Sequence, residues 1–363
     1  MSLEPKPGIL EIEPYVAGRA PSPEEQPAFK LSSNESALGA SPKAIAAYEA
    51  ARNDLASYPD GGAVRLRNAI AERHGLNAER IVCGSGSEEL LSLIARAYVR
   101  PGDEVLFTEH GFIVYRIAAL SSSAVPVAVP EENLRADVGA ILAKVTPHTR
   151  LVYLANPNNP TGSCLSTQEV ERLHAGLPDK VLLVIDAAYA EYVQRDDYDP
   201  GIKLASRFDN VVMTRTFSKI YGLAGLRVGW AYCPPSVADA LNRVRGPFNV
   251  TTAAQAAATA AVSDTDHVAR SVAHNAEWKS WLVQKIRAVG LGVDEGEGNF
   301  LLVRFPGDVP HGAKGADAFL TSRGFILRPV ANYGLPHCLR LTIGTEEANR
   351  GVARALADFM RTA

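Results

Sequence analysis

Four polar side chains in the middle of the chain have the chemistry of a small-molecule site. Lys219 lies in "TRTFSK", Asp186 ends "VLLVID", Tyr189 follows three residues later, and Asn159 lies in "NPNNPTG". Singly, such residues are usually an exposed lysine, a helix cap or part of a turn. Together, an amine, a carboxylate, a phenol and an amide at the ends of apolar segments predict one shared binding site.

This set suits an aldehyde cofactor that carries a pyridine ring and a phosphate. Burial lowers the pKa of a lysine, so Lys219 can form a Schiff base with the aldehyde and later act as a general base. The negative charge of Asp186 favours a protonated ring nitrogen, which lets the ring accept electrons. Asn159 and Tyr189 can form hydrogen bonds with the ring oxygen.

The phosphate of such a cofactor needs hydroxyls, a guanidinium and backbone amides. Thr216, Ser218 and Arg227 flank the lysine, and the guanidinium offers a bidentate, charge-assisted pair of hydrogen bonds. The segment "GSGSEELL" opens a predicted helix, whose first amides at Ser87 and Glu88 can point at an anion.

The glycines of this segment also permit a dinucleotide-binding loop. That fingerprint, G-x-G-x-x-G, would begin at Gly84 and Gly86 and needs a third glycine at position 89, which is Glu89. The departure favours the phosphate of a smaller cofactor over a nicotinamide-dependent oxidoreductase.

Short apolar segments that alternate with helical segments must position these residues. Short β-branched runs closed by turn residues predict buried strands, and apolar residues at helical spacing predict helices. The predicted strands are "RIVCGSG", "DEVLFTE", "TRLVYLANP", "KVLLVIDAAY", "NVVMTRTFS" and "LRVGWAY", and two predicted helices are "SEELLSLIARAYV" and "STQEVERLHAGL". The alternation predicts an α/β fold, with a mostly parallel sheet sandwiched by helices and ligands at the carboxyl ends of its strands.

The pattern divides the chain into three parts. Prolines near the start predict an extended N-terminal arm over residues 1–35, and the alternating pattern predicts a large α/β domain over 36–249. Over 250–363 the regular alternation of strand and helix segments ends, and a smaller α+β domain is predicted. Its segments are the alanine-rich "TTAAQAAATAAV", a polar helix, "GNFLLVRF", "GFILRP" and "CLRLTIG".

Composition and charge argue against several other classes of function. Lys and Arg total 37 against 40 Asp and Glu, and no basic run predicts a nucleic-acid surface. We see no signal-peptide pattern and no run of roughly 18 apolar residues, so we expect a cytoplasmic protein without membrane contact. Four separated cysteines favour reduced buried thiols. The histidines, among them His267 and His274 on the surface of a polar helix, form no metal-binding motif.

In their order along the chain, these motifs resemble those of the fold type I pyridoxal-phosphate aminotransferases, within the class II family. The resemblance covers nearly the whole chain and is highly specific for fold and cofactor. It rests on "PYVAGR", "LSSNES", "YPDGG", "GSGSEELL", "NPNNPTG", "DAAYAEY", "TRTFSKIYGLAGLRVGW", "GNFLLVRF" and "LRLTIGTEEAN".

Roles for the cofactor residues follow from the resemblance, motif by motif. It implies that Lys219 holds pyridoxal 5'-phosphate, that Asp186 faces the pyridine nitrogen, and that Asn159 and Tyr189 bond the ring oxygen. The implied phosphate ligands are Ser87, Glu88, Thr216, Ser218 and Arg227.

Two aromatic residues complete the implied cofactor site. Phe112 in "HGFIVYR" matches a ring that stacks on the cofactor, where a tyrosine is common in the family. Tyr58 in "SYPDGG" matches a residue that reaches the cofactor phosphate of the neighbouring subunit, which implies a homodimer with shared active sites. Ser36 and Ala37 depart from the family's usual Asn-Glu-Asn-Pro, a change in the local turn.

The implied activity is transamination in histidine biosynthesis. An amino group passes between L-histidinol phosphate and 2-oxoglutarate, giving imidazole acetol phosphate and L-glutamate. Arginine can bind either the phosphate or the carboxylate, so Arg340 in "CLRLTIG" and Arg328 in "FILRP" are the candidate anion ligands. Tyr15 in "PYVAGR" and Asn34 in "LSSNES" are the other candidate substrate residues.

Other functions are compatible with parts of this pattern. An aromatic amino-acid aminotransferase or a phosphothreonine decarboxylase of the same fold would use the same cofactor residues. A binding module that has lost catalysis is a further alternative, which the presence of Lys219, Asp186 and Arg227 argues against.

Overall fold

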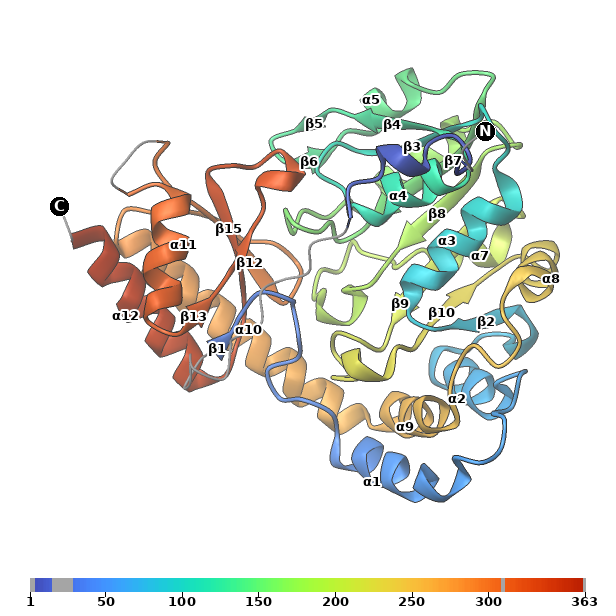
Figure 1. The fold of residues 1–363 in the computed structure, drawn as a ribbon, viewed down its shortest axis with the longest axis horizontal. Helices are drawn as coiled ribbons and strands as arrows, with labels where there is room; N and C mark the ends of the chain where they lie inside the picture. Colours follow the sequence, from blue (N-terminus) through green and yellow to red (C-terminus); the bar gives the residue numbers. More distant parts are fainter. Residues whose placement is uncertain (1–3, 15–28, 308–310, 362–363) are drawn as a thin grey trace.

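Two main β-sheets, each covered by its own helices, organise the computed structural model of the protein, and two short strand pairs accompany them (Figure 1). The structure describes residues 4–14, 29–307 and 311–361. The larger sheet and its helices contain the middle of the chain, and the smaller sheet contains strands from the C-terminal part. The long helix α10 (Thr265–Ala288) runs from one part to the other (Figure 1).

Seven strands form the larger sheet, and all but one of them are parallel. Their order across the sheet is β2 (Ile81–Gly84), β10 (Gly229–Tyr232), β9 (Val211–Thr216), β8 (Leu182–Asp186), β7 (Thr149–Ala155), β3 (Glu104–Thr108) and β4 (Val125–Val129). Strand β10 runs antiparallel to both of its neighbours. The prediction of a mostly parallel sheet and of six of its strands is confirmed, and β4 is an edge strand that was not anticipated.

Residues of β8 illustrate why these segments are continuously apolar. Leu183 and Ile185 enter the core on one face of the sheet, whereas Leu182 and Val184 enter the core on the other. A strand that is buried on both faces cannot alternate apolar with polar residues. Polar residues therefore collect where the strands end.

Helices cover both faces of this sheet. One core includes residues of α3 (Ser87–Tyr98), α4 (Val114–Ser121) and α8 (Pro235–Val244). The opposite core includes residues of α2 (Val64–His74), α5 (Val138–Ala143), α6 (Thr167–Gly176), α7 (Ile202–Arg207) and α9 (Thr252–Ser263). Helix α9 also contacts α1 (Pro42–Ala50). A short hairpin, β5 (Glu131–Glu132) with β6 (Arg135–Ala136), follows β4.

Local sequence explains where the predicted helices begin. The Ser166 side chain accepts a hydrogen bond from the Glu169 amide, and the Glu169 carboxylate accepts one from the Ser166 amide, so α6 begins with a capping box. Helix α3 begins directly after Gly86, whose φ of 85° is a left-handed value that favours glycine.

The smaller sheet has four antiparallel strands. Their order is β11 (Gly292–Asp294), β12 (Phe300–Arg304), β15 (Cys338–Thr342) and β14 (Arg328–Pro329). Residues of α10, α11 (Ala313–Ser322) and α12 (Glu346–Arg361) form a core against it. Beside it, β1 (Phe29–Lys30) pairs with β13 (Phe325–Ile326), so the start of the chain is tied to its end.

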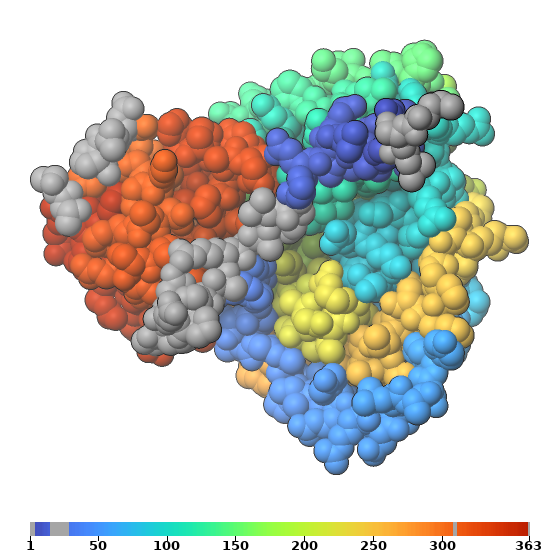
Figure 2. Space-filling view, viewed as in Figure 1, coloured from blue at the N-terminus to red at the C-terminus, as the bar shows by residue number. Residues whose placement is uncertain are grey.

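The described part of the N-terminal segment lies on the larger sheet's helices. A short 3-10 turn, Ile9–Glu11, contacts α4, and the Ser123 hydroxyl donates to the Pro7 carbonyl at 3.1 Å. Figure 2 shows this segment in dark blue on the surface of the larger part. The domain boundaries at residues 35 and 249 stay predictions.

The placement of His267 on the helix surface was wrong. His267 is buried, and its Nε2 lies 3.1 Å from the Gly39 carbonyl oxygen, while the half-buried His274 bonds the Gly344 carbonyl at 2.9 Å. A backbone carbonyl packed against α10 can accept a hydrogen bond from the histidine ring. The pattern of polar residues along the helix does not reveal that such a partner is present.

Other expectations concern thiols, metals and membranes. All four cysteines are free and buried, as expected. Within the described ranges, no three His, Cys, Asp or Glu side chains gather in a cluster that could hold a metal ion. No helix in that part of the chain has both the length and the apolar character needed to span a lipid bilayer.

Candidate active site

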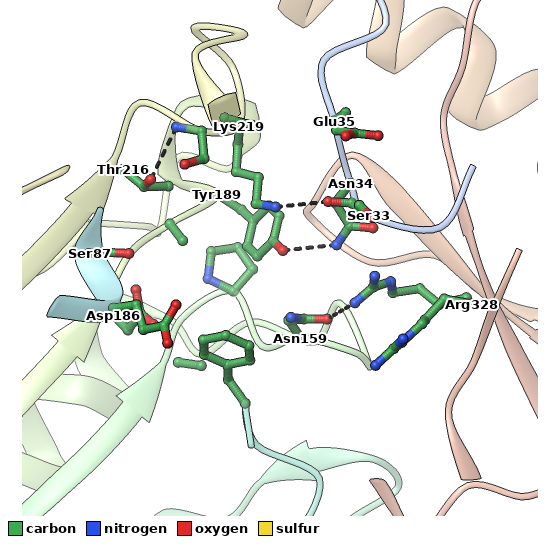
Figure 3. Close-up of a pocket in the computed structure, with 18 of the residues that line it drawn as sticks. Ser33, Asn34, Glu35, Ser87, Asn159, Asp186, Tyr189, Thr216, Lys219 and Arg328 are labelled. Atoms are coloured by element: carbon green, nitrogen blue, oxygen red, sulfur yellow. Dashed lines mark hydrogen bonds between the residues drawn. The ribbon is translucent and has the colours of Figure 1, made fainter. Parts of the chain in front are cut away.

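A cavity of about 260 Å³ lies between the carboxyl ends of the large sheet and the smaller sheet (Figure 3). Most of the residues predicted for the site line it. These are Asn34, Ser87, Glu88, Phe112, Asn159, Asp186, Tyr189, Thr216, Ser218, Lys219, Arg227, Arg328 and Arg340.

Lys219 lies in the turn that follows β9 and extends into this cavity. Its Nζ donates to the Ser33 carbonyl at 3.0 Å (Figure 3). Burial, helped by the positive charge of Arg340, lowers the pKa of Lys219 to about 7, although the Glu35 carboxylate opposes this effect. The amine is therefore available in its neutral form near neutral pH, as a nucleophile or a base requires.

Asp186 ends β8 and is only 6% exposed. The Tyr115 hydroxyl donates to its Oδ2 at 2.8 Å, and the Thr214 hydroxyl donates to its Oδ1 at 3.3 Å. Burial raises the pKa of Asp186, and these two hydrogen bonds oppose that rise. Sequence reasoning missed Tyr115 and Thr214, although both lie in segments already quoted for other residues, because neither segment shows that its hydroxyl faces Asp186.

Tyr189 follows Asp186 in the same loop and faces the segment before α1. Asn34 Nδ2 donates to the Tyr189 hydroxyl oxygen at 2.9 Å, and the Thr342 hydroxyl donates to Asn34 Oδ1 at 3.2 Å. Burial raises the pKa of Tyr189 to about 12, so the phenol keeps its proton. Because its oxygen already accepts from Asn34, the O–H group can donate to a ligand.

Hydroxyls, a guanidinium and the start of α3 form a polar cup at one end of the cavity. Arg227 Nη1 lies 3.5 Å from the Ser218 hydroxyl, and the Ser218 amide donates to the Thr216 hydroxyl at 3.1 Å. A Cβ on Gly86 would lie 2.7 Å from Arg227 Nη2, and a Cβ on Gly229 would collide with the Ser87 amide. Glycine is therefore required for this close approach, and the donors suit an anion.

Glu89, whose presence argued against a dinucleotide loop, supports this cup. Its carboxylate accepts from the Ser85 amide and from Asn249 Nδ2, the latter at 2.8 Å. It thereby restrains the loop that precedes α3. The sequence pattern alone gave Glu89 no such structural role.

Arg328 and Arg340 form the opposite side of the cavity. They are directly paired across β14 and β15 and are 7% and 5% exposed. Arg340 donates to Asn159 Oδ1 and, at 2.7 Å, to the Ser32 carbonyl. Like charges opposite one another are unfavourable in a sheet, whereas a planar guanidinium pairs well with a carboxylate or a phosphate.

Three predicted aromatic residues have different surroundings. Phe112 lines the cavity, and its ring meets the Tyr115 ring edge-on, with centroids 6.0 Å apart. Tyr58 is 82% exposed, stacks on Phe248 at 4.7 Å, and does not line the cavity of its own chain. Tyr15 falls outside the described residues.

Comparison with known proteins gives a consistent result. Residues 26–356 match the family model for aminotransferase class I and II. The histidinol-phosphate aminotransferase of Rhodopseudomonas palustris strain BisB18 is 54% identical over 357 residues, which is 98% of each chain. The enzyme of the same name from strain TIE-1 is 53% identical with the same coverage.

Solved structures with a similar fold include two further aminotransferases. The histidinol-phosphate aminotransferase of Sinorhizobium meliloti, in complex with pyridoxal-5'-phosphate, has a TM-score of 0.86 and 30% identity, over 92% of this chain and 90% of that one. A double mutant of Thermus thermophilus aspartate aminotransferase has a TM-score of 0.80 and 21% identity, over 91% of each chain, a likeness of fold alone.

Proposed function

The chain belongs to the class I and II aminotransferases, and we propose that it exchanges an amino group between L-histidinol phosphate and 2-oxoglutarate, with pyridoxal 5'-phosphate as cofactor. The products are imidazole acetol phosphate and L-glutamate, and the reaction belongs to histidine biosynthesis. One observation carries the proposal: a lysine with a pKa of about 7 and two buried arginines face the same cavity.

The donors around the cavity fit this cofactor. The polar cup of Ser87, Thr216, Ser218 and Arg227, with the amides at the start of α3 that include Glu88, would hold the phosphate. Because Gly86 and Gly229 carry no Cβ, Arg227 and the start of α3 pack closely together and would present their donors to one anion.

The remaining residues would hold the ring. Asp186 would face the pyridine nitrogen, Asn159 and Tyr189 would bond the ring oxygen, and Phe112 would stack on the ring. When bound, the cofactor supplies an aldehyde that reacts with amines and a ring that accepts electrons. The carboxylate of Asp186 favours the protonated ring nitrogen that this electron uptake needs.

Lys219 would carry the proton in the reaction. Near neutral pH, a neutral fraction of its amine can take the proton from the substrate carbon that bears the amino group. The protonated amine would then give that proton to the carbon atom of the cofactor's aldehyde group. The lysine enters the cavity from the turn after β9, where its Nζ donates to the Ser33 carbonyl at 3.0 Å.

Arg340 and Arg328 would bind the anionic ends of the two substrates. Glutamate and 2-oxoglutarate present a carboxylate, and histidinol phosphate presents a phosphate, and the planar fork of a guanidinium suits both. Asn34 would fix Tyr189 beside the substrate. Tyr15 remains a proposed further ligand of the substrate phosphate.

We further propose a homodimer in which Tyr58 serves the partner's site. Tyr58 and Phe248 are stacked and exposed, and further exposed apolar side chains occur nearby in the sequence, at Leu38, Ile45, Tyr48, Leu55 and Val64. Large apolar groups gathered on a surface often mark an interface between proteins.

We also propose that the protein acts in the cytoplasm. Its free buried cysteines are compatible with a reducing compartment.

An absorbance titration tests the substrate. The protein is loaded with pyridoxal phosphate and titrated separately with L-histidinol phosphate, phenylalanine and phosphothreonine. We expect histidinol phosphate to convert the visible band of the cofactor at much the lowest concentration. Preference for phenylalanine would indicate an aromatic aminotransferase, and release of carbon dioxide from phosphothreonine would indicate a decarboxylase.

A protein that stays colourless because it cannot be loaded with pyridoxal phosphate would overturn the enzymatic assignment itself.

Arg304 offers a matched control for the anion-binding arginines, since it lies on the same sheet but is exposed and pairs with Asp294. Arg304→Met is expected to leave the titration with histidinol phosphate unchanged.

A further inference from the structure

Tyr115 is a buried tyrosine that contacts the carboxylate of Asp186 from a helix 71 residues earlier in the chain. It lies in the first turn of α4, is 1% exposed, and donates to Asp186 Oδ2 at 2.8 Å. Its amide also donates to the Phe112 carbonyl at 3.0 Å, so one turn carries both the Phe112 ring and this hydroxyl.

The Tyr115 ring has little freedom to move. It stacks on the Tyr153 ring with centroids 4.8 Å apart and planes 11° apart, and the Tyr153 hydroxyl donates to the Leu91 carbonyl at 2.7 Å. The hydroxyl of Tyr115 is therefore held at a fixed point beside Asp186 by packing that involves β7 and α3.

We propose that Tyr115 is a positioning residue. It orients the Asp186 carboxylate toward the cofactor's ring nitrogen and stabilises the charged form of that carboxylate. The inference rests on the proposed function, because Asp186 matters in this way only if a pyridine cofactor binds. Tyr115 acts through Asp186 and needs no contact with the reacting atoms.

Every group facing Asp186 bears on its charge. Burial favours the neutral acid, whereas the Tyr115 and Thr214 hydroxyls, the Ala188 amide and the positive charge of Lys219 favour the carboxylate and lower its pKa. The phenols of Tyr153 and Tyr189 lie near enough to feel the same charge. Loss of the Tyr115 hydroxyl therefore raises the pKa of Asp186 and leaves Oδ2 without this donor.

The test compares Tyr115→Phe with Tyr153→Phe. Both variants remove one buried hydroxyl from the same ring stack, but only the first removes a hydrogen bond to Asp186. We expect Tyr115→Phe to weaken binding of pyridoxal phosphate to the apoprotein by roughly tenfold or more, the usual scale for a hydrogen bond to a charged group. We also expect its affinity to begin falling at a higher pH than in the wild type as the solution is acidified.

The results separate the two proposals. If the wild type fails to bind the cofactor, both the function and this inference are overturned. The positioning role is wrong, and the function stands, if the wild type binds the cofactor and Tyr115→Phe does not differ from it. The comparison covers both cofactor affinity and its dependence on acid pH, and Tyr153→Phe is the control for loss of a buried hydroxyl. Thermal unfolding of each apoprotein checks that the variants are folded.

A second variant covers the case in which Tyr115→Phe does not fold. Replacement of Tyr115 by 3-fluorotyrosine keeps the ring and strengthens the hydroxyl as a donor. The acid limit of cofactor binding is then expected to move to lower pH, opposite to the Phe variant. An unchanged acid limit would contradict the proposal, since a purely structural ring has no reason to shift it.

Discussion

Lys219 and Arg340 are basic side chains on opposite sides of one cavity, and burial affects their charges differently. Burial and the charge of Arg340 lower the pKa of Lys219 to about 7. A guanidinium, in contrast, keeps its proton in proteins. The side of the large sheet is thus suited to moving a proton, and the side of the smaller sheet is suited to holding an anion.

The two sides also position their side chains by different means. Lys219 follows β9 in a turn and Asp186 ends β8, at the carboxyl ends of parallel strands. Arg328 and Arg340 lie within strands, where the register of β14 and β15 places them opposite each other. An amine on a turn and a pair of guanidinium groups on strands match the tasks of transfer and recognition.

Lys219→Ala is the largest perturbation of this contrast. We expect turnover to fall by at least ~1000-fold, because loss of a general base alone costs roughly 10² to 10⁴ in rate and the covalent link is lost as well. Stopped-flow or steady-state rates with histidinol phosphate measure the loss, and thermal unfolding reports whether the fold is intact.

Lys279→Ala is the matched control for that loss. Lys279 also has a pKa lowered by burial and donates to a backbone carbonyl, that of Gly296, at 2.7 Å, but it lies on α10 outside the cavity. Its replacement is expected to leave turnover nearly unchanged. Undiminished turnover in Lys219→Ala would contradict the assignment of proton transfer to the large-sheet side of the cavity.

Arg340→Met perturbs the other side. We expect kcat/KM to fall by ~10- to 100-fold for both glutamate and histidinol phosphate, the scale of a lost charge-assisted hydrogen bond. The affinity for pyridoxal phosphate is expected to change much less. An equally large loss of cofactor affinity would contradict the separation of tasks, and Arg304→Met is the control on the same sheet.

Much of the first side could be predicted from the sequence, because strand ends are visible in it. Asp186 ends a continuous apolar run, Lys219 follows the strand that begins with "NVVM", and parallel strands bring such ends to one edge. Tyr115 could not be found this way. It lies in a helix with apolar neighbours, and only the packing of α4 on β7 turns its hydroxyl toward Asp186.

The second side was less predictable for a physical reason. Arg328 and Arg340 were selected because a guanidinium can bind either anion, and the register that pairs them is not visible in either segment alone. His267 was misplaced because its burial depends on the Gly39 carbonyl, which is far away in the sequence. For His267 the decisive partner is 228 residues away along the chain.

A pH series on the apoprotein tests the neutral state of Lys219. Between pH ~7 and ~10.5 the unfolded lysine holds a proton that the folded one lacks, so the free energy of unfolding rises with pH, by at most ~1.4 kcal/mol per pH unit. Lys219→Met is expected to lack this contribution. Urea unfolding of both proteins over this pH range measures the contribution of Lys219 as the difference between their slopes. Buried tyrosines and cysteines titrate alike in both proteins and cancel in that difference. Identical slopes would show that Lys219 is not neutralised.

The smallest expected effect connects the two sides. Because the charge of Arg340 lowers the pKa of Lys219, Arg340→Met is expected to raise that pKa, by only part of the total lowering since burial contributes more. Competitive acetylation of the apoprotein at different pH values, read by mass spectrometry of the Lys219 peptide, measures the shift. Arg340→Lys keeps a positive charge but loses the planar fork, so it is expected to bind substrate poorly while leaving the pKa of Lys219 near its original value. If both variants raised that pKa equally, the effect would come from altered packing, and the arginine side would not be tuning the lysine through its charge.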